Sequence, residues 1–437
     1  MERSPIPQSS KEEDSKAALT GGQSMCPSDA TPALREEDRR EGRASLLARG
    51  RWAYPEDHSD RDLRIDFLRG MVLFVLIIIH IDIFSFYNFL VWERIGCISG
   101  GEGFVILSGV VVGMVYRKKI AKQGWRDAVL RLLDRAVQLY RINVFVIASI
   151  ALLSLVPFID AQTVMTFNDR VAGQTYPLYP NPEASLQEWV AKILLLQVGP
   201  HQLQVLGLYV VLMGVSPIAL WFMCNERTAV FLLFSWVLYF KNWAFPSMLT
   251  GAQFEYAFPV LTWQLIYFHG MAAGFHREKI ATFMQGPYGK PLLVGASILF
   301  LGFLFFAQNT TNPNLPSYAR LHIIPPEIFD SLYSRYFMKN TLGILRVANY
   351  VVALVVGYAL FTRFWVLWER TFGWFLIPVG QASLYAFIVH VYIVLLLGNF
   401  AIFAQENIGV NTAAHTFALL LIWLMVKKEV FFRWIPH

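Results

Sequence analysis

The sequence predicts an all-α protein, a polytopic membrane helix bundle of about ten transmembrane helices. Of its 437 residues, 55% are apolar and only 16% are charged, whereas a soluble domain carries about 25% charged residues. Runs of roughly 20 mostly apolar residues recur along the chain, and each is long enough to cross a hydrocarbon core about 30 Å thick. Most basic residues lie beside these runs, as topology signals do in membrane proteins.

The first 60 residues differ in composition from the rest. Residues 1–60 are rich in Ser, Pro, Glu and Arg, include the charged run Arg35–Arg43, and show almost no periodic apolar pattern. Such a segment cannot bury enough apolar surface to offset the entropy lost on ordering. We therefore expect a disordered cytoplasmic tail over 1–60 and a transmembrane domain over 61–437.

Ten apolar segments have the length of a membrane-spanning helix. The expected spans are 66–86, 97–116, 137–158, 203–224, 228–246, 258–276, 291–308, 341–362, 374–398 and 412–432. Two long connections separate some of them. The first ends in Ser185–Gln197, whose amphipathic pattern predicts a helix lying on a membrane surface. The second, 308–339, contains several prolines and is expected to be a loop.

The distribution of basic residues predicts the orientation of the chain. Seven Lys and Arg residues lie between Arg117 and Arg135, and alternate connections are consistently richer in them. By the positive-inside rule, both termini face the cytoplasm and both long connections face outward. The net charge of +6 follows this topology and forms no continuous groove, so it does not indicate a nucleic-acid partner. The three cysteines lie far apart and predict neither a disulfide nor a metal site.

The first span carries ionisable residues at both ends. Arg69 and His80 are almost three helical turns apart, so their side chains share one face and are separated by roughly 16 Å along the axis. Asp66 lies one turn before Arg69 and can pair with it. A neutral imidazole inside a bundle is suited to taking and returning a proton, which makes His80 a candidate general base. The alternatives are that Arg69 only snorkels to head groups and that His80 is a core histidine bonded to a carbonyl.

Five motifs occur together along the chain. They are RIDFLRG with its following histidine, GEGFVILSG (Gly101–Gly109), PHQLQVLGLYVVLMGVSP (Pro200–Pro217), WQLIYFHG (Trp263–Gly270) and GQASLYAFIVH (Gly380–His390). In this order they resemble the transmembrane succinyltransferases of osmoregulated periplasmic glucans, the OpgC type. That family belongs to the wider acyltransferase-3 superfamily, which shares an arginine, ten residues and a histidine in the first helix. The resemblance implies an acyltransferase domain over 61–437 in the inner membrane.

The resemblance also implies further site residues. Glu102 would line the active site, and Ser108 with Gly109 would let a ligand approach the backbone. Independently of the resemblance, the positions of Glu102 and Asp82 predict that one of them orients the His80 ring or stabilises its charged form. The alternative for the glycines is packing, because Gly109 and Gly113 form a small-xxx-small face that fits another helix.

Three more polar residues lie in apolar surroundings. His390 reaches a depth similar to that of His80, so the two can meet across the bundle, and Tyr385 lies closer to the inner side. A structural role is the alternative for His390. Arg346 lies in the outer third of its span, where a planar guanidinium would suit the free carboxylate of a succinyl chain. Outward snorkelling is its alternative.

Together these residues predict acyl transfer across the membrane. Acyl-CoA, as a co-substrate and not a permanently bound cofactor, would place its nucleotide near Asp66 and Arg69 on the cytoplasmic side. A glycan hydroxyl would enter from outside, and His80 would act on it as general base. An acyl-histidine intermediate is a variant of this scheme. The rival prediction is a secondary transporter or exporter that uses the buried His, Arg and Glu as a proton relay.

Overall fold

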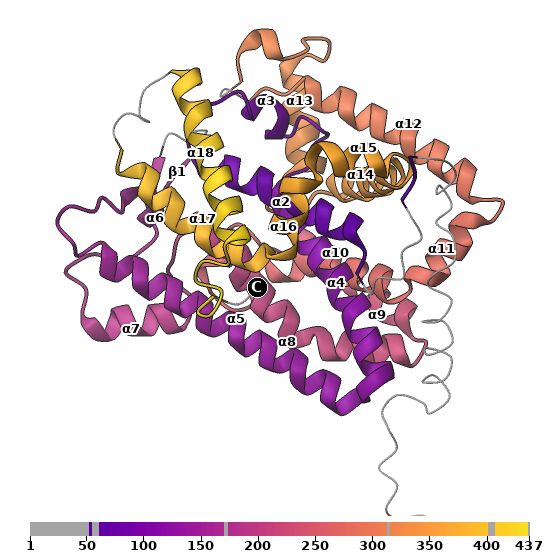
Figure 1. The fold of residues 1–437 in the computed structure, drawn as a ribbon, viewed down its shortest axis with the longest axis horizontal. Coiled ribbons are helices and arrows are strands. Elements are labelled where there is room, and N and C mark those ends of the chain that lie inside the picture. Colours follow the sequence, from indigo (N-terminus) through magenta and orange to yellow (C-terminus); the bar gives the residue numbers. More distant parts are fainter. Residues whose placement is uncertain (1–51, 55–60, 170–173, 313–314, 401–406, 436–437) are drawn as a thin grey trace, which may run out of the picture.

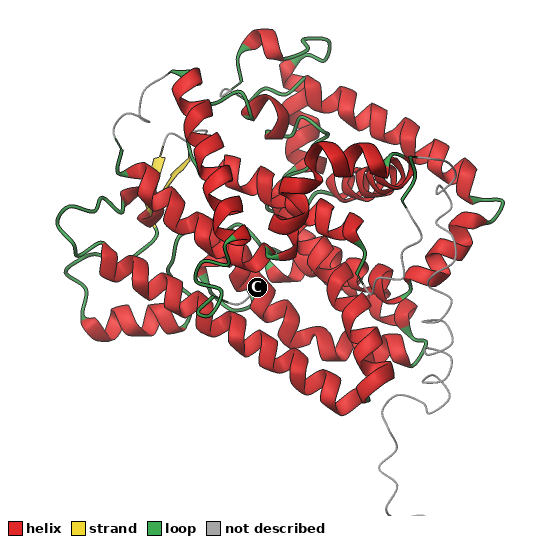
Figure 2. Cartoon of the chain, viewed as in Figure 1, coloured by secondary structure: helices red, strands yellow, loops and turns green. Residues whose placement is uncertain are grey.

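The computed structural model describes residues 52–54, 61–169, 174–312, 315–400 and 407–435. In this part of the chain the structure is a helix bundle, with one small antiparallel sheet of strands β1 and β2 (Figure 2). The all-α prediction is confirmed. The predicted tail over 1–60 lies outside the described residues, apart from 52–54.

The elements follow one another along the chain as in Figure 1. The first half contains α2 (Leu63–His80), α3 (Asn88–Val91), α4 (Gly100–Gln123), α5 (Trp125–Leu153), α6 (Gln162–Met165), β1 (Thr166–Asp169), β2 (Gln174–Pro177), α7 (Leu186–Leu194), η1 (His201–Leu203) and α8 (Gln204–Cys224). The second half contains α9 (Thr228–Ala244), η2 (Gln253–Tyr256), α10 (Val260–Phe275), α11 (Arg277–Gln285), α12 (Gly289–Gln308), η3 (Ser317–Ala319), α13 (Pro326–Leu332), η4 (Tyr333–Phe337), α14 (Ile344–Arg363), α15 (Trp365–Trp368), η5 (Glu369–Gly373), α16 (Trp374–Gln381), α17 (Ser383–Gly398) and α18 (Ile408–Lys427).

Several of these helices can cross a membrane. Among the described residues, five are long and apolar enough: Trp125–Leu153, His201–Cys224, Gly289–Gln308, Ile344–Arg363 and Ile408–Lys427. A bent pair of helices would make a sixth. Helices α9 and α10 have only 17 and 16 residues, and α2 carries three charged side chains. The expected number of about ten spans therefore stays a prediction.

The expected ninth span is not one straight helix. The segments Trp365–Gln381 and Ser383–Gly398 meet at an angle of 91°. The break falls at Ala382, whose backbone leaves the helical region (φ −97°, ψ 38°), four residues after Pro378 inside α16. Composition alone predicted a continuous span here because both halves are equally apolar.

Close contacts between glycines hold the centre of the bundle together. Helices α4 and α10 pack through two glycine pairs that face each other's backbone, Gly109 and Gly113 on α4 and Gly270 and Gly274 on α10. A Cβ atom on any of the four would lie 2.0–2.4 Å from a carbonyl oxygen of the other helix. Gly109 and Gly113, in the expected second span, therefore pack against a neighbouring helix. Helix packing was the alternative to a ligand-binding role for these glycines.

Replacing Gly109 with leucine is expected to force α4 and α10 apart. The added Cβ would lie 2.1 Å from the Tyr267 carbonyl oxygen, and backbone cannot yield as a flexible side chain does, so the loss of stability should be about 1–3 kcal/mol or more. A thermal-unfolding curve of the purified protein in detergent measures this. Gly295→Leu is the matched control, because a Cβ at Gly295 on α12 meets nothing within 4 Å. Equal melting temperatures for both variants would contradict the packing account.

One end of the bundle is joined by buried charges. Asp62, which caps α2, binds the Arg64 guanidinium at 2.8 Å and lies 3.7 Å from that of Arg277. Arg64 also donates to the Thr362 hydroxyl near the end of α14 at 3.0 Å. Burial raises the pKa of Asp62, but the hydrogen bond and positive charge of Arg64 outweigh it and hold this pKa below its ordinary value. The beginning of α2, the beginning of α11 and the end of α14 therefore meet at one face.

Loops meet at the opposite end. Arg94 donates to the Ala319 carbonyl at 2.6 Å and its own carbonyl accepts from Gln308 at 2.7 Å. The Asn399 amide oxygen accepts from the Asp160 backbone N–H at 2.7 Å. The connections after α2, α5, α12 and α17 thus lie at the end of the bundle away from Asp62, as expected for helices that alternate in direction.

Candidate active site

Two histidines meet inside the bundle. His80 is the last residue of α2 and His390 lies in the middle of α17, and His80 Nδ1 is 2.8 Å from His390 Nε2. Their rings stack with centroids 5.0 Å apart and planes 19° apart. His390 is buried, with 1% of its surface exposed, whereas His80 remains partly exposed. The His390 imidazole is therefore closed off from solvent, whereas the His80 imidazole is accessible.

Hydrogen bonds fix the proton positions on this pair. His390 Nδ1 contacts the Phe387 carbonyl oxygen, which can only accept, so Nδ1 carries the hydrogen. In a neutral His390 the Nε2 atom is then an acceptor, and His80 Nδ1 must donate to it. His80 Nε2 is left with a free lone pair. The hydrogen bonds from His80 to His390 and from His390 to the Phe387 carbonyl thus leave His80 Nε2 able to accept a proton.

A third histidine, which the sequence analysis did not select, lies beside this pair. The His201 ring in η1 stands edge-on to that of His80, with centroids 5.9 Å apart and planes at 88°. Its Nδ1 atom is buried and has no hydrogen-bond partner among the described residues. His201 belongs to the PHQLQVLG motif. His201 lies directly before the expected span 203–224, at a depth similar to that of His80 at the end of its own helix. This position was the signal that could have identified His201 as a site residue.

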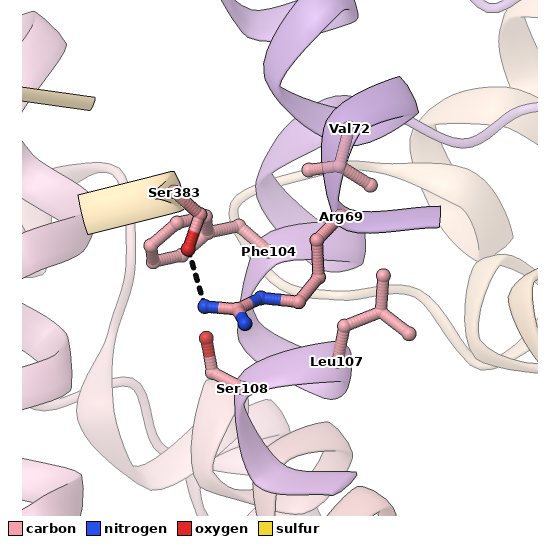
Figure 3. A pocket seen from close by; sticks show the side chains of 6 residues that line it. All are labelled: Arg69, Val72, Phe104, Leu107, Ser108 and Ser383. Carbon is pink, nitrogen blue, oxygen red and sulfur yellow. Dashed lines mark hydrogen bonds between the residues drawn. The ribbon is translucent and has the colours of Figure 1, made fainter. Parts of the chain in front are cut away.

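At the other end of α2, Arg69 reaches into a small cavity. The cavity has a volume of about 10 Å³, and its lining residues are Arg69, Val72, Phe104, Leu107, Ser108 and Ser383. Figure 3 shows the Arg69 side chain extending between Ser383 and Ser108 and donating to the Ser383 hydroxyl. Asp66 lies 3.8 Å from the Arg69 guanidinium, as their spacing predicted, and Arg61 binds the same carboxylate at 2.6 Å. Arg69 is therefore turned inward and is not extended to the surface.

Aromatic rings connect the cavity to the histidines. Phe104, a cavity residue, packs 5.1 Å from the Phe387 ring, and Phe387 packs 5.0 Å from the His390 ring. The Tyr209 ring also packs against Phe104, with ring centroids 6.2 Å apart. The Arg69 cavity and the histidine pair thus belong to one continuous region along the same face of α2.

Glu102 takes part in a different network. It forms a capping box with Ser99 at the start of α4 and accepts a hydrogen bond from Arg346. Arg346 is 0% exposed; its other donors bind Glu93 at 2.6 Å and the Phe337 carbonyl at 2.8 Å. Glu102 is therefore not the hydrogen-bond partner of His80, and His390 holds that position. The snorkelling interpretation of Arg346 is wrong because its guanidinium is fully buried.

The sequence analysis missed two partners of this network. Glu93 adopts a left-handed backbone conformation (φ 54°), and its carboxylate accepts from both Arg346 and the Tyr333 hydroxyl. A residue of this type in that region is strained, so the two bonds help to hold the loop. A substrate carboxylate at Arg346 would have to displace Glu93 or Glu102. Substrate binding by Arg346 remains a prediction, and it requires that one of these two carboxylates moves away.

Two other predicted residues lie apart from the histidines. Asp82 is exposed on the loop beyond the end of α2. Tyr385 is buried, and its hydroxyl donates to the Val430 carbonyl at 2.6 Å, which anchors the segment after α18. In the described part of the chain, no group of three or more His, Cys, Asp or Glu side chains is arranged to hold a metal ion.

A family model described as "OpgC protein" matches residues 61–433. The match covers most of the 437-residue chain. This chain belongs to the OpgC family. The resemblance drawn from five motifs is thereby confirmed. No curated protein and no solved structure matches the sequence.

OpgC membership gives the site a chemical context. It implies an enzyme of the acyltransferase or succinyltransferase type that modifies glucans at a membrane. The apolar helices likewise indicate a membrane protein. An acyl transfer from thioester to hydroxyl needs a group that accepts the hydroxyl proton, and the exposed nitrogen of His80 is an atom of that kind.

Proposed function

We propose that this OpgC family member is an inner-membrane O-acyltransferase. It transfers a succinyl or acetyl group from cytoplasmic acyl-CoA to a hydroxyl of a glycan outside the cytoplasm. The observation that carries the proposal is the hydrogen-bonded pair of His80 and His390, which leaves a free lone pair on the partly exposed imidazole. Acyl-CoA acts as a co-substrate, and the same architecture fits the wider acyltransferase-3 superfamily.

The reaction needs only one base. His80 Nε2 takes the proton of the acceptor hydroxyl as its oxygen attacks the thioester carbonyl carbon. The tetrahedral intermediate collapses, the carbon–sulfur bond breaks, and the thiolate of CoA takes the proton back from the imidazolium. His390 accepts from His80 Nδ1 throughout, so it orients the ring. The products are a glycan ester and free CoA.

The donor would approach from the end of α2 that carries Arg69. Arg69 stands roughly 16 Å of helix away from His80, and Asp66 lies almost one turn further away. A nucleotide held at that end would extend its pantetheine arm along the cavity toward the imidazole. The cavity, at about 10 Å³, has room for hardly more than one water molecule. Binding of the arm therefore has to widen it, and movement of Arg69 away from Ser383 is the simplest way.

The proposed topology has ten spans and two cytoplasmic termini. The contacts at the two ends of the bundle support it: Asp62, Arg277 and Thr362 gather at the proposed cytoplasmic face. The loops around Arg94 and Asn399 gather at the opposite face. Helices α2, α4 and α10 would count as spans that other helices shield from lipid. Helix α9 would be a short span with an exposed apolar face, and α16 with α17 would form one broken span.

A transporter is the second candidate, because one observation favours it. Transporters often bind their substrates at helices broken within the membrane, and the 91° bend before Ser383 lies next to Arg69. Flux that depends on a proton gradient, in the absence of any acyl transfer, would support this candidate.

The test of the proposed function is an acyl-transfer assay. Membranes containing the protein are given labelled succinyl-CoA or acetyl-CoA, and periplasmic glucans are extracted and examined for label. The proposal expects label on glucan hydroxyls only when the protein is present. Label that never leaves CoA, for either donor, would refute it.

Replacing His390 with phenylalanine is expected to lower kcat by about 10- to 100-fold with little change in KM. The ring shape is kept, but His80 Nδ1 loses its acceptor, so the His80 ring is no longer held with Nε2 free. His390→Gln, which restores an acceptor oxygen, should recover part of the rate. His269→Phe on α10 is the control, since among the described residues the His269 ring hydrogen-bonds only to the Leu265 carbonyl of its own helix. An equal loss for the Phe and Gln variants would argue for a packing role alone.

A further inference from the structure

A tightly fixed turn presents one lysine toward the histidines. The turn follows η4 and includes Lys339. The buried Trp263 indole donates to the Asn340 carbonyl at 3.2 Å, and the buried Tyr239 hydroxyl donates to the Leu342 carbonyl at 2.9 Å. Two backbone carbonyls just after Lys339 are thus held by side chains of α9 and α10, and the turn that carries the lysine has a defined position.

The Lys339 ammonium lies at the start of α4. Its Nζ atom stands 5.7 Å from the centre of the Phe258 ring, and Phe258 packs against Gly101, the residue before Glu102. The neighbouring Gly100 packs against Leu76, which lies one turn before His80 on α2. Lys339 therefore lies at the end of α2 that carries His80.

Apart from the Phe258 ring, this ammonium has no partner in the described part of the chain. Among the described residues it forms neither a hydrogen bond nor an ion pair, although it is half-buried. The nearest carboxylates, Glu93 and Glu102, are both bound to Arg346. Burial lowers the pKa of Lys339 and the charge of Glu102 raises it. A cation removed from water without a counter-ion is costly, so this position suits an anionic ligand.

We propose that Lys339 binds the free carboxylate of a dicarboxylic acyl donor and so selects a succinyl group over an uncharged acyl group. In a succinyl thioester the carboxylate carbon is three carbon–carbon bonds from the reacting carbonyl. With that carbonyl at His80, the carboxylate can point toward the turn that carries Lys339. The sequence analysis predicted that Arg346 binds this carboxylate. Lys339 takes that role in the proposal, because Arg346 already forms ion pairs with two glutamates.

The inference rests on the proposed acyl transfer at His80, so its test includes a readout that needs no turnover. Binding of succinyl-CoA and of butyryl-CoA, which has the same chain length and no carboxylate, is measured on the purified His80→Ala variant with and without Lys339→Met. We expect Lys339→Met to weaken succinyl-CoA binding by about 10- to 100-fold and to leave butyryl-CoA binding nearly unchanged. Lys339→Arg should retain the preference. Lys241→Met, at an exposed lysine that bonds to Ser247, is the control.

Transfer assays then separate this inference from the proposed function. In protein with His80 intact, Lys339→Met should lower kcat/KM for succinyl-CoA relative to butyryl-CoA by a similar factor. An equal loss for both donors would overturn the inference and place Lys339 at the reacting carbonyl instead. Unchanged preference for succinyl-CoA in both assays would also overturn it. Succinyl-selective binding that depends on Lys339, without transfer to any glucan, would refute the proposed function and leave the carboxylate site standing.

Discussion

Replacing His80 with alanine is expected to lower kcat/KM for acyl transfer by about 10²- to 10⁴-fold. The other candidate bases in the described site are less available: His390 Nε2 is occupied by His80, Glu102 is bound to Arg346, and the unpaired Nδ1 atom of His201 is buried. The measurement is the initial rate of label transfer from succinyl-CoA to glucan, at matched amounts of protein in the membrane.

Two controls make the His80 result specific. The variant should keep the melting temperature of the wild type to within a few degrees, because His80 ends α2 and is partly exposed. His269→Ala should retain full activity. A His80→Ala protein that is folded and transfers label at the normal rate would remove this imidazole from the mechanism.

Replacing Arg346 with methionine is expected to destabilise the protein by about 3–5 kcal/mol, the usual cost of leaving a buried charge without its partner. The substitution strands Glu102, which is 1% exposed, and frees Glu93 and the Phe337 carbonyl. Thermal unfolding in detergent measures the loss. The double variant Arg346→Met with Glu102→Gln should recover part of it, because the remaining side chain is uncharged.

The same pair of variants decides between a structural and a substrate-binding Arg346. Arg335→Met, at an exposed arginine in η4, serves as the control. If Arg346→Met unfolds at the wild-type temperature and only raises KM for succinyl-CoA, Arg346 binds the donor as the sequence suggested. The network with two glutamates then contributes little to stability.

Much of the fold could be predicted from apolar segment lengths. The spans expected at 203–224, 228–246 and 291–308 agree with α8, α9 and α12 to within a few residues. The start of α5 at Trp125 was missed because its first turns are rich in charge, although Ala128 and Leu132 point inward at helical spacing. The break at Ala382 was missed because hydropathy does not record backbone direction. Contacts with other helices decide both features.

The site was predicted where one helix carries it and missed where the fold assembles it. The Arg69 and His80 relation depends only on helical spacing, and the pairing with His390 follows from matched depth. His201 lies in a 3₁₀ turn and Lys339 in a loop near the end of α2 that carries His80. Segment lengths do not predict where the residues of a turn or loop lie in the folded bundle. Arg346 was placed at the right depth, but its carboxylate partner Glu93 comes from an irregular loop that no pattern indicated.

Transfer between two separated compartments tests the central claim most directly. The purified protein is reconstituted into sealed vesicles that contain glucan inside, and labelled succinyl-CoA is added only outside. The account predicts labelled glucan inside the vesicles and free CoA outside, both abolished by His80→Ala. Label that reaches glucan only when donor and acceptor share one compartment would contradict a single imidazole that serves both sides of the membrane.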